Sequence, residues 1–140
     1  MDLFYTLMLW AHFLGLALGG AAAFGQPVLG AVGAATPEAR PHMMRASRVL
    51  TMLGRAGLAL LVISGVVMMA QRFEAAAMPA SFWIKMLLVM ALIVNVVMAG
   101  LAARAAAAGD AGRAGRLPTH ARISAALLVL LVLFAVLAFG

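Results

Sequence analysis

The segment Phe82–Ala103 reads FWIKMLLVMALIVNVVMAGLAA, and its length and composition decide the fold. Only Lys85 near its start and Asn95 inside it are strongly polar. A helix needs about 20 predominantly apolar residues to cross the hydrocarbon core of a bilayer. In that core every backbone amide must be bonded within its own segment, so the run is predicted to be a transmembrane helix.

Three other runs of the chain have the same character. The sequence therefore predicts an all-α fold, a four-helix transmembrane bundle with up-down topology, whose spans are residues 3–32, 49–70, 82–103 and 123–139. The connections between the runs contain prolines and glycines, which indicate turns, and none is long enough to fold alone. We therefore expect residues 1–140 to form a single domain.

The composition identifies the solvent that this fold requires. Of the 140 residues, 66% are hydrophobic and 10% are charged, whereas a soluble domain is about half apolar and a quarter charged. The lipid bilayer is thus the expected partner. The net charge of +6 comes from arginines in the gaps between apolar runs, which is typical of membrane-flanking residues and not of a nucleic-acid-binding face. Because the chain has no cysteine, disulfides and thiolate metal sites are excluded.

The arginines also predict the orientation. The first connection holds Arg40, Arg45 and Arg48, and the third holds four more: Arg104, Arg113, Arg116 and Arg122. The second connection holds only Arg72, balanced by Glu74. Basic connections stay in the cytoplasm, so we expect a bacterial inner membrane protein with both termini in the periplasm. The start Met1-Asp2-Leu3 lacks the basic region of a signal peptide, which favours a retained first span.

Polar side chains inside spans are costly and are candidates for function. His12 lies in the first span, and about 100° per residue places it on one face with five others: Gly15, Gly19, Ala23, Gln26 and Gly30. Small residues on that face would let a helix or a flat ligand come close. The imidazole could ligate haem iron or move a proton, or it could be a neutral histidine hydrogen-bonded across helices.

Lys85 and three further polar residues have two interpretations each. Lys85 either extends to the membrane interface or holds an anion such as a propionate close to His12. Arg55, Asn95 and Gln26 either form one polar cluster in the cytoplasmic half or serve as structural hydrogen-bonding groups, with Arg55 reaching lipid phosphate. His42 and His120 are expected in loops, where they would contact lipid headgroups or nothing.

The stretch Phe82–Val89, with Trp83 and Lys85, together with a histidine in the first span and basic residues before the second, resembles the HemJ family of bacterial protoporphyrinogen IX oxidases. That resemblance implies a b-type haem and an oxidoreductase, with His12 matching the family's first-helix histidine and Lys85 its third-helix lysine. The family's third helix usually carries a further histidine, where this chain has Val94-Asn95-Val96-Val97. The Lys85–Asn95 stretch also resembles the copper-resistance D family.

Three hypotheses of function remain open at this point. The first is a small membrane redox protein that binds haem b, in which His12 is the axial or proton-handling ligand and Lys85 the anion anchor. Arg55, Asn95 and Gln26 would form a second polar patch, and whether the chain is an enzyme is left open. The second is an accessory or assembly subunit of a larger membrane complex or a homo-oligomer, docked through the glycine-rich first helix. The third is copper handling by the methionines Met68, Met69 and Met78.

Overall fold

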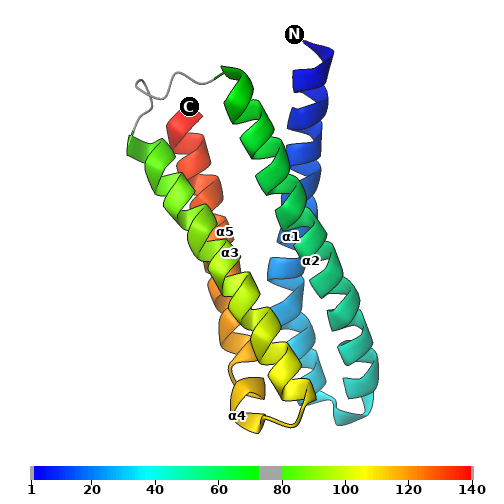
Figure 1. Ribbon diagram of the computed structural model, residues 1–140. Coiled ribbons are helices and arrows are strands. Elements are labelled where there is room, and N and C mark those ends of the chain that lie inside the picture. Colours follow the sequence, from blue (N-terminus) through cyan, green and yellow to red (C-terminus); the bar gives the residue numbers. More distant parts are fainter. Residues whose placement is uncertain (1, 73–79, 140) are drawn as a thin grey trace. The chain divides into compact units, whose positions relative to one another are not determined.

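The computed structural model describes residues 2–72 and 80–139 of the chain (Figure 1). The elements in order are α1 (Leu3–Ala35), a 3₁₀ turn η1 (Pro37–Ala39), α2 (Arg40–Arg72), α3 (Ala80–Ala107), the short α4 (Ala111–Ala114) and α5 (Leu117–Phe139). The prediction of an all-α fold with four long apolar helices is confirmed. Four segments of the described chain are long and apolar enough to cross a membrane, Leu3–Ala35, Pro37–Gln71, Ala80–Ala107 and Ala111–Leu137. The protein is therefore a small multi-pass integral membrane protein.

The chain divides into two compact units, Met1–Ala77 and Met78–Gly140. Each unit is an antiparallel helical hairpin, the first made of α1 and α2 and the second of α3 and α5 with α4 in the turn (Figure 1). The prediction that residues 1–140 form one domain stays a prediction.

The helices are longer than the predicted spans, and the predicted loops are correspondingly shorter. α1 and α2 have 33 residues each, which is about 50 Å of helix, against a hydrocarbon core of about 30 Å. The expected first loop shrinks to Thr36 and η1, and α2 begins at Arg40, so His42 and all the arginines of that stretch are helical. Pro41 does not prevent this, because the first turn of a helix has amides that need no partner within the helix.

The turn of the second hairpin shows why the expected third loop is mostly structured. The amides of Gly109 and Asp110 donate to the carbonyls of Ala106 and Ala105, and Gly109 has a φ of 99°, a Schellman motif that ends α3. The Asp110 carboxylate then accepts from the Arg113 amide at 3.0 Å and caps α4. α5 begins at Leu117, with Pro118 in its first turn, so His120 is also helical.

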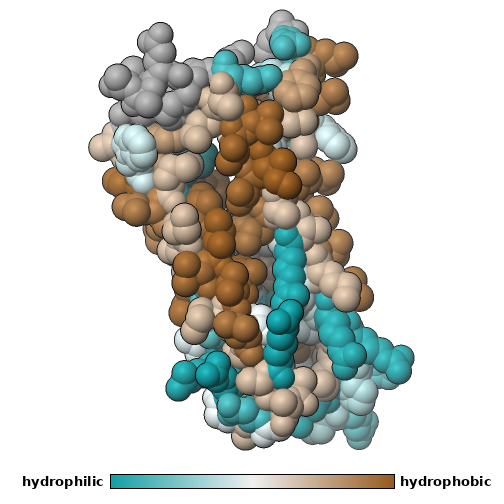
Figure 2. Space-filling model, viewed as in Figure 1, coloured by the Kyte–Doolittle hydropathy of each residue, from teal (hydrophilic) through white to brown (hydrophobic). Residues whose placement is uncertain are grey.

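Few side chains of this fold are buried in protein. Large apolar residues stay open to the surroundings on every long helix, for example Leu3 at 74% and Leu87 at 72% exposure. Hydrophobic side chains cover most of the visible surface, and hydrophilic ones collect mainly around the α1–α2 turn and the α4 region (Figure 2). Lipid is the solvent that such a surface requires.

Candidate functional site

The position of His12 follows from how closely α1 and α2 approach each other. A Cβ atom added at Gly57 would lie 2.6 Å from the Gly19 amide nitrogen and 2.7 Å from the Gly15 carbonyl oxygen. A Cβ at Gly54 would lie 2.6 Å from the Ala22 Cβ. The backbones can be this close only because both helices present small residues, the usual device of membrane helix pairs.

The seam between α1 and α2 has alternating spacings of three and four residues, which is the spacing of a left-handed coiled coil. On α1 it contains His12, Gly15, Gly19, Ala22, Gln26 and Gly33. On α2 it contains Met43, Ser47, Leu50, Gly54, Gly57, Leu61 and Ser64. The predicted face of α1 is therefore right for four residues and wrong for Ala23 and Gly30. A Cβ at Gly30 would meet nothing within 4 Å, and the seam passes through Ala22 and Gly33 instead.

His12 is hydrogen-bonded to α2 through Ser64. Its Nδ1 lies 3.0 Å from the Ser64 Oγ, and that hydroxyl lies 2.6 Å from the Leu60 carbonyl oxygen and 3.3 Å from the Leu61 carbonyl oxygen. When the one hydroxyl proton goes to the Leu60 carbonyl oxygen, the Ser64 Oγ accepts from Nδ1–H of His12. Ser64 is 1% exposed, so the acceptor is held in place by the packed seam.

Gln26 is satisfied within the same hairpin. Its Nε2 donates to the Ser47 carbonyl oxygen at 2.8 Å and to the Thr51 Oγ1 at 2.9 Å. Its Oε1 accepts from the Ser47 hydroxyl at 2.7 Å. Both amide protons of Gln26 are used, and the side chain ties α1 to the start of α2 just before Pro27.

Asn95 forms the matching network in the second hairpin. Its Nδ2 donates to the His120 carbonyl oxygen at 2.9 Å and to the Ser124 Oγ at 2.8 Å, and its Oδ1 lies 2.7 Å from the His120 Nδ1. A carbonyl oxygen can only accept, so Nδ2 must face it and Nδ1 of His120 must donate to Oδ1. The expectation that His120 is a loop residue touching headgroups or nothing is wrong. The spacing of His120 and Ser124, four residues apart on one helical face, is the signal that identifies it.

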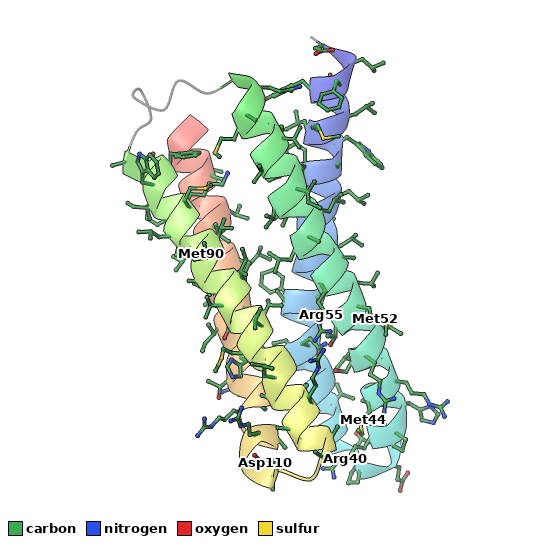
Figure 3. All side chains as sticks on the ribbon, viewed as in Figure 1. Arg40, Met44, Met52, Arg55, Met90 and Asp110 are labelled. Carbon is green, nitrogen blue, oxygen red and sulfur yellow. The ribbon has the colours of Figure 1, made fainter. Side chains whose placement is uncertain are left out.

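The other predicted site residues are distributed differently from the expectation. Gln26 and Asn95 are each bonded within their own hairpin, while Arg55 has an exposed side chain on α2 (Figure 3). These bonds support the structural interpretation of both amides. Lys85 is partly buried on α3, and its approach to His12 stays a prediction.

No group of three or more histidine, aspartate or glutamate side chains that could hold a metal ion occurs among residues 2–72 and 80–139. Of the three methionines considered for copper, Met68 and Met69 lie on α2, and Met78 lies outside the described residues.

Searches of protein-family models, curated proteins and solved structures find no match to this chain. The resemblance to the HemJ and copper-resistance D families therefore stays a prediction from the sequence.

Proposed function

We propose that the protein is a small membrane redox protein in which His12 would hold a b-type haem. The observation that carries the proposal is the chain from His12 Nδ1 through the Ser64 hydroxyl to the Leu60 carbonyl oxygen. Histidines that ligate a metal almost always donate their other ring N–H to a protein acceptor, which sets the tautomer and the ring orientation. His12 meets that requirement.

Gly65 lies beside the His12 ring, and a Cβ added there would make an ordinary van der Waals contact with His12 Cε1 at 3.6 Å. A bound haem would supply one-electron chemistry at its iron.

Ser64 orients the imidazole and keeps its proton on Nδ1, and the small residues of the seam hold Ser64 in position. Gln26 and Asn95 are left out of this proposal as ligand-binding groups, because their hydrogen-bonding capacity is used within their own hairpins.

An absorption spectrum of the purified protein tests the proposal. We expect a Soret band in the natural protein, its loss in His12→Ala, and a weaker or shifted band in Ser64→Ala. His120→Ala is the matched control, because that imidazole has the same tautomer but belongs to another network, and it should leave the band unchanged. Absence of a Soret band after loading with haem would remove the haem proposal.

The accessory-subunit hypothesis stays a prediction. Of the first-helix glycines expected to form its docking surface, Gly15 and Gly19 pack against α2 within the hairpin. A larger complex or a homo-oligomer stays a prediction without a surface assigned to it.

A further inference from the structure

One face of α2 points directly away from the α1–α2 seam and is exposed along its length. At about 100° per residue, seven residues fall within an arc of about 80° opposite the seam. We call them the outer face of α2: Arg45, Arg48, Met52, Arg55, Ala59, Ile63 and Val66. All seven are exposed, for example Met52 at 70% and Ile63 at 61%.

The outer face is divided into a cationic part and an apolar part. Its first four residues include three arginines, and its last three are aliphatic. No carboxylate neutralises these arginines within residues 2–72 and 80–139, where the ion pair present joins Arg113 to Asp110 at 3.8 Å. The described part of the chain therefore leaves the positive charge of this face without a carboxylate partner.

The depth of Arg55 indicates what kind of anion this is. Arg55 lies seven residues beyond Arg48, about 10 Å further along the helix, and close to the middle of α2 (Figure 3). An arginine one or two turns inside an apolar span directs its guanidinium back toward the headgroups. Arginine binds phosphate through two parallel N–H bonds, so a lipid phosphate between Arg48 and Arg55 would satisfy both side chains.

We propose that the outer face of α2 is a binding site for one anionic phospholipid. Its phosphate contacts Arg48 and Arg55, and an acyl chain runs along Ala59, Ile63 and Val66. The small Ala59 leaves room for the chain directly after the headgroup. A free phosphate would use the arginines but gain nothing from the aliphatic residues, which is why the site favours a lipid.

Native mass spectrometry of the delipidated protein in detergent tests this proposal. Phosphatidylglycerol and phosphatidylcholine with identical acyl chains are titrated against the natural protein and the double variant Arg48→Gln/Arg55→Gln. Each arginine near a membrane surface strengthens anionic-lipid binding about fivefold, so the double variant should lose about 25-fold in phosphatidylglycerol affinity. Its phosphatidylcholine binding should not change.

Two controls distinguish a specific lipid-binding site from a general effect of the protein's positive charge. Arg116→Gln/Arg122→Gln removes the same charge from the second hairpin and should leave the high-affinity phosphatidylglycerol binding in place. Inorganic phosphate at millimolar concentration should compete poorly with the lipid. Equal losses in the two double variants, equal binding of the two lipids, or full displacement by inorganic phosphate would each overturn the proposal. Far-ultraviolet circular dichroism confirms that each variant is still helical.

Discussion

His12 and His120 obtain their tautomers by the same device. Each histidine lies next to a polar side chain that donates to a backbone carbonyl oxygen. Ser64 donates to the Leu60 carbonyl oxygen, and Asn95 donates to the His120 carbonyl oxygen. What remains on that neighbour is an acceptor, so the histidine must donate from Nδ1. For Asn95 the assignment is fixed by the His120 carbonyl oxygen, which can only accept and so must face the amide nitrogen.

The Asn95 network predicts a measurable loss of stability. Asn95→Leu keeps a side chain of similar size but leaves the His120 Nδ1–H, the His120 carbonyl oxygen and the Ser124 hydroxyl without this partner. Hydrogen bonds between membrane helices contribute on average about 0.6 kcal/mol each, so we expect a loss of about 1–2 kcal/mol. Unfolding in detergent, followed by circular dichroism, measures it.

A double-mutant cycle gives the control for this loss. His120→Ala added to Asn95→Leu should cost much less than His120→Ala alone, because the partner has already been removed. If the two costs add, or if Asn95→Leu is as stable as the natural protein, the network does not hold α3 and α5 together.

The sequence identifies the polar residues inside the spans, but it does not identify their hydrogen-bond partners. His12, Gln26 and Asn95 stand out because polar groups in apolar runs are rare. Their partners Ser47, Ser64 and Ser124 do not stand out, since serine is common in membrane helices and can satisfy itself on the preceding turn, as Ser64 does with Leu60. Whether these serines face the polar residues depends on how the second helix of each hairpin is aligned along the first.

At the level of the element, the α1–α2 seam explains why the predicted face of α1 drifts away from the observed one. A face drawn at 3.6 residues per turn moves from Ala22 to Ala23 and then to Gly30. The observed seam repeats at 3.5 residues per turn, because two helices that stay in contact must wind around each other. The seven-residue spacing of His12, Gly19, Gln26 and Gly33 was readable in the sequence.

The seam also predicts which glycines tolerate a methyl group. In Gly57→Ala the new Cβ would meet backbone atoms of Gly15 and Gly19 at 2.7 and 2.6 Å, so the helices must separate. We expect a loss of about 1–3 kcal/mol, the usual cost of overpacking. Thermal unfolding in detergent measures the change.

Gly30→Ala is the matched control for this substitution. It lies in the other helix of the same hairpin, and its Cβ would meet nothing within 4 Å. Since alanine is the better helix former, the variant should equal the natural protein or gain up to about 1 kcal/mol. Similar losses in both variants would mean that helix propensity, and not close approach, decides the effect.

For the whole molecule, the number and the class of the elements follow from the solvent. In a bilayer an apolar run must satisfy its backbone hydrogen bonds within itself, which a helix does. Four such runs therefore predict four long helices, even when their contacts are unknown. The helix ends are less predictable, because outside the hydrocarbon the chain can continue as helix or turn. The first connection illustrates this, where residues expected in a loop extend α1 to Ala35 and start α2 at Arg40.

The arginines also predict how the whole molecule is oriented in the membrane. The α1–α2 turn and the α4 turn are rich in arginine, and such connections stay in the cytoplasm.

The chain has no cysteine, so single cysteines can be introduced at exposed positions without background labelling. Ala35→Cys and Ala114→Cys should react with a membrane-impermeant maleimide only after the cells are opened. Leu3→Cys should react in intact cells, since the first helix begins on the opposite side. Labelling of Ala35→Cys and Ala114→Cys in intact cells would invert the topology, and with it the assignment of the arginines of α2 to the inner leaflet.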